Sequence, residues 1–150
     1  TDLMVGFPGE SDEAFENSLT FAQSVGLGRV HVFPFSPRKG TRAASMPGQV
    51  PRQVVRERAK RAIDISEGLL SSYAKRWVGR GVSVLAEGGH GDFLSGWSRH
   101  YLRVVSKNRR NDSAGVELLL KPERQDRGIL FCEAAELCAP DSFQESILAP

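Results

Sequence analysis

The order of apolar runs and turn residues at the start of the chain predicts a strand, a turn and a helix. Residues 3–5 form a short apolar run that ends in the turn sequence Gly-Phe-Pro-Gly at 6–9. Ser11 is placed as an N-cap, and apolar residues recur every three or four positions over 12–25 before Gly26. A buried strand followed closely by an amphipathic helix predicts half of a βαβ unit. The apolar stripe of this helix is expected to consist of Phe15, Leu19, Ala22 and Val25.

The next apolar run, 29–36, is apolar on both faces apart from His31. This pattern is typical of a strand in a parallel sheet that helices cover on both sides, and His31 is then expected to be a core histidine with its hydrogen bonds satisfied. A polar loop with Arg38 follows, and a long helix is expected to begin near Pro51, because proline is tolerated in a first helical turn.

After Gly81 the apolar period changes from helical to two residues. The sequence predicts about five short strands in roughly fifty residues, near 82–87, 93–97, 101–105, 116–120 and 128–132, which is typical of a small antiparallel barrel. The expected organisation is therefore an α/β part over 1–78, an all-β barrel over 79–134, and a tail over 135–150. The tail is expected either to form a short helix near 143–148 or to be disordered.

Composition is ordinary for a soluble globular protein, with 40% hydrophobic and 25% charged residues among 150. The net charge is only +2, but residues 51–80 hold eight Lys and Arg against three Asp and Glu. Such a helix is either a solvated face or a surface that approaches nucleic-acid phosphates. No apolar run has the length of a membrane span and no signal peptide opens the chain, so a cytoplasmic location is expected.

The candidate metal ligands are few and scattered. The spacing of Cys132 and Cys138 matches no zinc or redox motif, so free thiols are expected. The three histidines have no carboxylate or cysteine partner at ligand spacing. We therefore expect no metal site built from this chain alone.

Two stretches have the residue types of a binding site. Gly6 and Gly9 lie at the carboxyl end of a predicted strand, where backbone can approach a flat ligand, although a simple tight strand-to-helix turn is the more common explanation of such residues. Trp97 and Tyr101 lie among cations on or near one predicted hairpin, an arrangement that suits RNA, since aromatic faces stack on bases and cations meet phosphates. The alternative is that both aromatic residues belong to the core of the barrel.

Three motifs in this order resemble a known protein family. They are the segment Asp-Leu-Met-Val-Gly-Phe-Pro-Gly-Glu at 2–10, the segment His-Val-Phe-Pro-Phe-Ser-Pro-Arg-Lys-Gly-Thr at 31–41, and the segment Gly-Trp-Ser-Arg-His-Tyr-Leu-Arg-Val at 96–104. Over residues 1–133 the chain resembles the last third of a radical S-adenosylmethionine (SAM) methylthiotransferase. Within the family it looks most like the branch that acts on threonylcarbamoyladenosine in tRNA.

The resemblance implies a fold and a set of cofactors. The expected fold class is α/β, with the C-terminal portion of a radical SAM partial (β/α) barrel followed by a small all-β TRAM barrel, which is OB-like. The complete enzyme would use S-adenosylmethionine and two 4Fe-4S clusters, one of which generates a deoxyadenosyl radical. The Cys-x-x-x-Cys-x-x-Cys loop that binds this cluster is absent from the chain, so it is expected to be part of a longer protein and not to be active alone.

The resemblance also assigns roles to residues of this chain. The residues expected to border S-adenosylmethionine are Val5, Gly6, Phe7, Pro8, Phe33, Pro34 and Phe35. The residues expected to contact RNA are Arg38, Arg99, Tyr101, Arg103 and Lys107. The expected partners are a tRNA anticodon stem-loop, a reductant and a sulfur donor, with no membrane and a monomeric state.

Three other functions stay open on the sequence. One is a stand-alone RNA-binding module without catalysis. The others are methylthiotransferases that act on isopentenyladenosine or on a ribosomal protein. The presence of a cysteine triplet elsewhere in the protein separates the first from the rest, and the salt dependence of RNA binding separates an RNA substrate from a protein substrate.

Overall fold

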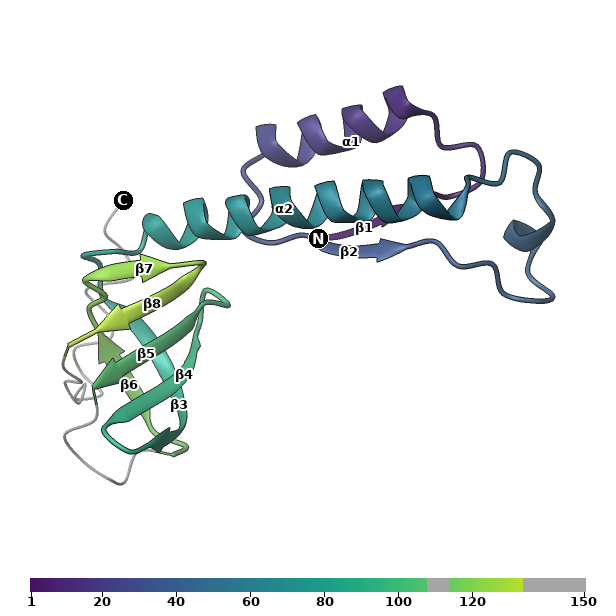
Figure 1. Cartoon of the computed structure of the whole chain (residues 1–150). Helices are drawn as coiled ribbons and strands as arrows, with labels where there is room; N and C mark the ends of the chain where they lie inside the picture. Colours follow the sequence, from purple (N-terminus) through teal and green to yellow (C-terminus); the bar gives the residue numbers. More distant parts are fainter. Residues whose placement is uncertain (108–113, 134–150) are drawn as a thin grey trace. The chain divides into compact units, whose positions relative to one another are not determined.

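The structure is a computed structural model that describes residues 1–107 and 114–133. The chain divides into two compact units, Thr1–Leu70 and Ser71–Pro150. The first unit is mixed α/β and the described part of the second is mostly β-sheet (Figure 1). The predicted order of an α/β part followed by a small all-β part is therefore confirmed.

The first unit contains a parallel βαβ arrangement, as predicted. Strand β1 (Asp2–Val5) is followed by helix α1 (Asp12–Ser24) and strand β2 (His31–Pro34). The two strands pair in parallel, with Asp2 opposite His31 and Val5 opposite Pro34. A short 3₁₀ helix, η1 (Arg42–Ser45), and the long helix α2 (Arg52–Lys75) complete the unit, and α2 continues past its boundary.

The predicted ends of α1 are present. The Ser11 hydroxyl accepts a hydrogen bond from the backbone N–H of Ala14 at 3.1 Å, and Asp12 and Glu13 lie in the first turn, where carboxylates favour the helix dipole. Gly26 ends the helix with φ +65°, a conformation that a residue with a Cβ rarely adopts.

The core of the first unit lies between the sheet and the two helices. Its buried members are Val5, Phe15, Leu19, Ala59 and Ala62, with Leu3, Val32 and Ile65 packed against them. The expectation that Val25 joins this stripe is wrong. Val25 is the C-cap of α1 and is 51% exposed, because the helix ends one residue before it.

The opposite face of this sheet is open, which corrects the expectation for β2. Both helices pack on the side of the sheet to which Val5 and Val32 point. Met4 and Phe33 are paired neighbours on the other side and are 52% and 49% exposed. His31 is also exposed, so the expectation of a core histidine is wrong. The apolar residues on both faces of β2 show that the sequence suits a covered strand, whereas the described residues of this chain cover one side.

The second unit is built on a six-stranded sheet in the order β6-β3-β4-β5-β8-β7 (Figure 1). The strands are β3 (Val82–His90), β4 (Phe93–Ser98), β5 (Arg103–Lys107), β6 (Glu117–Leu120), β7 (Arg124–Asp126) and β8 (Ile129–Cys132). Five predicted strands are present, and β7 was missed. All pairings are antiparallel except that of β5 with β8, which is parallel, so the expectation of a purely antiparallel barrel is wrong.

A β-bulge at Glu87 bends β3 across β4. Ala86 pairs with Gly96 and Gly88 pairs with Ser95, which leaves Glu87 as the extra residue. The backbones approach so closely here that a Cβ on Gly96 would lie 2.2 Å from the carbonyl oxygen of Leu85. Glycine at 96 is therefore a steric requirement of the curled sheet.

Side chains alternate between the two faces of this sheet, as the period of two predicts. One face is buried and carries Val82, Val84, Ala86, Leu94, Val104, Leu118, Leu120, Leu130 and Cys132. The other face is exposed and includes Leu85, Phe93 and Trp97. The segment at 101 differs from its prediction as a strand: Tyr101 has φ +58° and lies in the turn before β5.

The last residues of α2 pack within the second unit. The rings of Tyr73 and Trp77 meet edge to face, and the ring of His100 stacks on Trp77 with centroids 3.5 Å apart and planes 18° from parallel. Some expectations lie outside the described residues, namely those for Cys138, for the tail over 135–150 and for most of the basic loop over 107–112.

The stacked position of His100 predicts a pH dependence of stability. Burial lowers the pKa of His100 below its ordinary value of 6.5. Between the lowered pKa and 6.5 the unfolded chain binds a proton that the folded chain does not, so the free energy of unfolding should fall as the pH falls below 6.5. Urea unfolding at about pH 7 and about pH 5 measures this loss, which should be smaller in His100→Gln. An equal loss in both chains would contradict it.

Candidate functional site

The carboxyl ends of β1 and β2 carry an aromatic pair in the first unit. Gly6 follows β1 directly and Phe35 follows β2 directly, and the backbone N–H of Phe35 donates to the carbonyl of Val5 at 2.8 Å. The rings of Phe7 and Phe35 then meet edge to face, with centroids 5.2 Å apart. In parallel sheets ligands bind at this end of the strands, so this pair lies where a ligand is expected.

The turn after β1 needs glycine for two physical reasons. Gly6 has φ +76°, and a Cβ at this position would lie 2.4 Å from a methyl group of Val55 on α2. Its backbone N–H donates to the Glu10 carboxylate at 2.7 Å. The turn is therefore packed tightly against α2. A simple reverse turn would need glycine only for its positive φ, whereas this turn also needs it for the close approach of the helix.

A buried ion pair holds this turn to α2. The Arg58 side chain, only 8% exposed, donates from Nη1 to the Glu10 carboxylate at 2.5 Å and to the Glu10 carbonyl at 3.0 Å. Its Nη2 donates to Asp12 at 2.6 Å. Burial alone would lower the pKa of Arg58, but the hydrogen bonds to Asp12 and Glu10 outweigh it and raise the pKa, so the guanidinium stays charged.

The role of Arg58 was missed by reasoning from the sequence, although a signal was present. Arg58 lies three residues after Val55 and four before Ala62, so it occupies a position of the apolar stripe of α2. A cation at such a position needs a buried partner. The carboxylate of Glu10, in the turn after β1, is that partner.

The residues expected to border the cofactor have different environments. Phe7 and Phe35 lie together, and Phe33 lies on the open face of the sheet beside Met4. The side chain of Val5 points into the core, so only its backbone faces the strand ends. Pro8 is buried in the turn, and Pro34 is exposed at the end of β2.

The described residues do not form a metal site. Among residues 1–107 and 114–133, no three His, Cys, Asp or Glu side chains gather at a distance that would hold a metal ion. Cys132 is a thiol buried on β8, and its burial, with Glu123 nearby, raises its pKa to about 12. The chain has two cysteines, so it cannot supply by itself the three thiolates that hold the cluster binding S-adenosylmethionine.

The second unit presents Trp97 on its exposed face. Leu94, Gly96 and Ser98 on β4 are buried, whereas Trp97 alternates to the other side and is 39% exposed. Its paired neighbours are Leu85 on β3 and Arg103 on β5. Of the two alternatives that the sequence left open for Trp97, the structure supports the exposed one.

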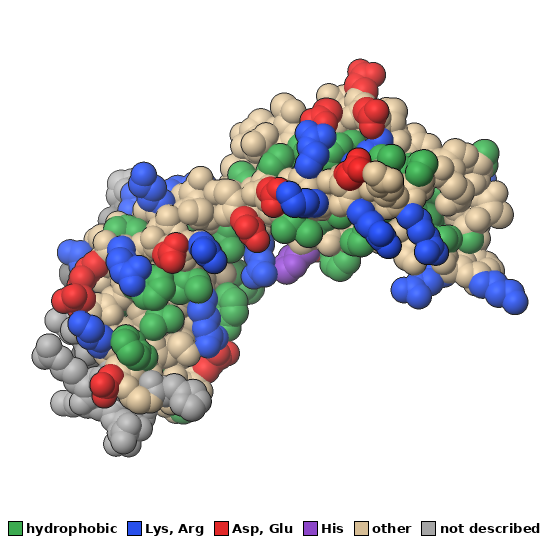
Figure 2. All heavy atoms as spheres, viewed as in Figure 1, with side chains coloured by type: hydrophobic (Ala, Val, Ile, Leu, Met, Phe, Trp, Pro, Cys, Tyr) green, Lys and Arg blue, Asp and Glu red, His purple; other side chains and the backbone are tan. Residues whose placement is uncertain are grey.

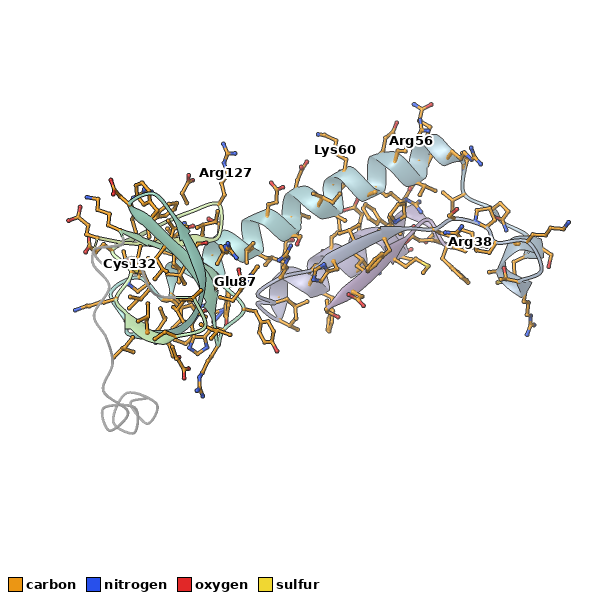
Figure 3. The ribbon with its side chains drawn as sticks, turned by 90° about the horizontal axis from the view of Figure 1, so that it is seen from below. Arg38, Arg56, Lys60, Glu87, Arg127 and Cys132 are labelled. Carbon is orange, nitrogen blue, oxygen red and sulfur yellow. The ribbon has the colours of Figure 1, made fainter. Side chains whose placement is uncertain are left out.

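Arg103 is fixed beside this ring by three contacts. Its guanidinium lies 5.6 Å from the centroid of Trp97, donates to Ser95 at 2.8 Å, and pairs with Glu87 at 2.5 Å. Glu87 is the bulged residue of β3, and its side chain lies on the curled sheet in Figure 3. The bulge thus places a carboxylate where it orients the arginine.

The other residues of the second unit that are expected to contact RNA are paired or exposed. Arg99 and Glu117 form an ion pair at 2.9 Å, and the hydrogen bonds from Arg99 and from Ser83 to this carboxylate lower the pKa of Glu117. Lys107 lies 3.9 Å from Glu133. Tyr101 is 85% exposed in the turn before β5.

These ion pairs lie at the surface. An exposed ion pair of this kind contributes about 1 kcal/mol or less to stability. Arg38 is separate from this group, because it lies on the loop after β2 in the first unit (Figure 3). The sheet therefore brings together Trp97, Arg99 and Arg103 within the second unit, and Arg38 is part of the first unit.

Comparison with known proteins gives the chain relatives of one kind. No family model matches it. It is 34% identical over 144 residues to the tRNA-2-methylthio-N(6)-dimethylallyladenosine synthase of Bacillus velezensis, covering 91% of this chain and 28% of that protein. It is 39% identical over 136 residues to the threonylcarbamoyladenosine tRNA methylthiotransferase MtaB of Thermotoga maritima, covering 89% of this chain and 31% of that protein.

The homologues of this chain are tRNA methylthiotransferases. A third, MtaB of Chlamydia pneumoniae, is 38% identical over 104 residues, which is 69% of this chain and 25% of that protein. The chain thus spans between a quarter and a third of the length of these relatives and corresponds to a partial region of such enzymes. The resemblance identified from the sequence motifs is confirmed. None of the described helices is both long enough and apolar enough to cross a membrane.

The buried pair predicts that removing Arg58 lowers the free energy of unfolding much more than removing Arg61, an exposed arginine of the same helix. Arg58→Ala leaves the Glu10 carboxylate without its buried partner, so the free energy of unfolding should fall by about 3 kcal/mol. The matched control is Arg61→Ala, which removes an exposed ion pair with Glu16 and should cost much less. Urea unfolding of both variants measures the difference. Equal losses would mean that the Arg58 pair does not hold the turn.

Proposed function

We propose that the protein of which this chain is a part adds a methylthio group to threonylcarbamoyladenosine next to the anticodon of tRNA. The observation that carries the proposal is the exposed pair of Trp97 and Arg103 on the sheet of a chain whose relatives are tRNA methylthiotransferases. The second unit is then the RNA-binding platform, and the first contributes part of a cofactor wall.

The exposed face of the sheet has the chemistry that unpaired RNA bases require. An aromatic side chain that stacks on a base contributes about 1–3 kcal/mol with little sequence preference. Trp97 offers its ring between Leu85 and Arg103, and Phe93 lies further along β4, 52% exposed. Loop nucleotides of an anticodon stem-loop are splayed out more readily than paired ones, so they suit such a surface.

Cations beside the ring would hold the phosphates. Arg103 is oriented by Glu87, and Arg99 is oriented by Glu117. Because both carboxylates are at least 40% exposed, a phosphate can replace either of them at small cost. In this proposal the acidic partners hold the arginines in place before RNA binds.

The cofactor part of the proposal rests on the aromatic pair at the strand ends. S-adenosylmethionine, when bound, would supply radical chemistry at this end of the sheet. Phe7, Phe33 and Phe35 would line its adenosine part. Apolar walls of this kind exclude water from the reacting groups. The clusters belong to parts of the protein outside this chain, so no step is assigned to them here.

A second candidate substrate is dimethylallyladenosine. The relative from Bacillus velezensis is named for that nucleoside, whereas those from Thermotoga maritima and Chlamydia pneumoniae are named for threonylcarbamoyladenosine. For either substrate the proposal takes the protein to be a cytoplasmic monomer, with a reductant and a sulfur donor as its other partners. The relatives named for tRNA support both more directly than a ribosomal protein.

Nucleoside analysis tests the reaction and the choice of substrate. The complete protein should be expressed in a bacterium that lacks its own methylthiotransferases, and the digested tRNA analysed by mass spectrometry. We expect threonylcarbamoyladenosine to gain the mass of one methylthio group in place of hydrogen. A gain on dimethylallyladenosine would favour the second candidate. No gain on either nucleoside would contradict the proposed function.

The platform predicts a specific loss of RNA binding. Arg99→Ala combined with Arg103→Ala should weaken binding of an anticodon stem-loop RNA and reduce its salt slope by about 1–2, because each phosphate contact releases counterions. Fluorescence anisotropy over a salt series measures both quantities. The control, Arg80→Ala with Lys121→Ala, removes the same charge outside β4 and β5. If the two double variants bind alike, these arginines do not form the RNA site.

A further inference from the structure

The first unit has a strongly basic surface that the proposed platform does not use. Residues 36–60 contain seven cations and one carboxylate, Glu57. Of the seven, only Arg58 is buried, in its pair with Glu10. The exposed ones are Arg38, Lys39, Arg42, Arg52, Arg56 and Lys60. Figure 2 shows Lys and Arg side chains along α2 and over the loop beside it.

Three of these cations form a row on α2, which we name the α2 stripe: Arg52, Arg56 and Lys60. Their spacing of four residues places them on one side of the helix, about 6 Å apart along its axis. Arg56 and Lys60 project from the helix in Figure 3. Val55 and Ala59 point into the core from a neighbouring side, so the stripe lies at the surface next to the packed face.

Folding does not require this arrangement. Like charges four residues apart destabilise a helix by about 0.2–0.5 kcal/mol per pair. Cations are also unfavourable near a helix N-terminus, and the first turn of α2 has no acidic residue to offset Arg52. Residues that disfavour the local structure are expected where a surface has a function.

Among the described residues, two of the three stripe residues lack the carboxylate partner that several other arginines of the chain have. Arg61, Arg99 and Arg103 each have a carboxylate within 2.9 Å. In the part of the chain that the structure describes, no carboxylate lies within ion-pair distance of Arg52 or Arg56. Lys60 has only a long contact with Asp64, at 3.6 Å between two exposed side chains. An anion can therefore bind Arg52 and Arg56 without displacing a carboxylate of this part of the chain.

The loop that carries the other cations is held to the same unit. The backbone N–H of Gly9 donates to the carbonyl of Gly48 at 2.9 Å, which joins the loop to the glycine turn. The Gln49 side chain donates to the carbonyls of Ala43 and Met46 at 2.9 and 3.0 Å, which braces η1. Arg38, Lys39 and Arg42 thus project from a segment that is fixed at its end.

We propose that the α2 stripe, extended by the cations of this loop, is a second RNA-binding surface that holds the phosphate backbone without reading sequence. This inference rests on the proposed function, because it takes RNA as the ligand. A row of evenly spaced guanidinium and ammonium groups suits a polymer of phosphates better than one small anion. The stripe would add affinity and leave base recognition to Trp97 and its neighbours.

The test neutralises the stripe while keeping the helix. The variant combines Arg52→Gln, Arg56→Gln and Lys60→Gln, since glutamine has a high helix propensity. Its matched control combines Arg29→Gln, Lys75→Gln and Lys121→Gln, which removes the same charge from exposed positions off the stripe. Binding of both 150-residue chains to an anticodon stem-loop RNA is measured by anisotropy over a salt series, and circular dichroism confirms that each chain is folded.

We expect the stripe variant to bind about tenfold more weakly than the control at low salt and its salt slope to be smaller by about 2, because three phosphate contacts are lost. Equal affinity and slope in the two triple variants would overturn the inference. If Arg99→Ala with Arg103→Ala still weakens binding in that case, only the stripe is excluded and the proposed platform stands. If the unaltered chain does not bind the RNA, both the platform and the stripe are wrong.

Discussion

The fold of the first unit depends on one buried guanidinium. Arg58 reaches from α2 to the turn after β1 and binds both the carboxylate and the carbonyl of Glu10, and the same carboxylate accepts the backbone N–H of Gly6. A charge in this position is costly unless it is paired, so the helix and the turn hold each other in place. The aromatic pair of Phe7 and Phe35 takes its position at the strand ends from this arrangement.

A second constraint shapes the exposed face of the six-stranded sheet. The close approach of β3 and β4 at Gly96 requires a residue without a side chain and accompanies the bulge at Glu87. The bulge brings the Glu87 carboxylate to Arg103, which then lies beside the ring of Trp97. Backbone geometry thus decides how a cation and an aromatic ring are presented together, and this presentation is the basis of the proposed RNA platform.

The charged residues of the chain fall into two kinds of surface. Arg99 and Arg103 are paired with carboxylates, which hold them in fixed orientations. On α2 the cations Arg52 and Arg56 are exposed and close to one another. The first kind suits orientation beside a base, and the second suits long-range attraction to a polyanion. In the two proposals, the first surface would orient the RNA and the second would raise the affinity for it.

The sequence by itself determined the local elements. The N-cap at Ser11, the stop at Gly26, the parallel order of β1 and β2 and the period of two after Gly81 all follow from backbone preferences and short-range patterns. The motifs that resemble methylthiotransferases also lie in the sequence, and the relatives confirm them. Tertiary structure decided the rest. The buried role of Arg58, the open face beneath Phe33, the parallel pairing of β5 with β8 and the outward position of Trp97 depend on contacts between segments far apart in the chain, which no local pattern specifies.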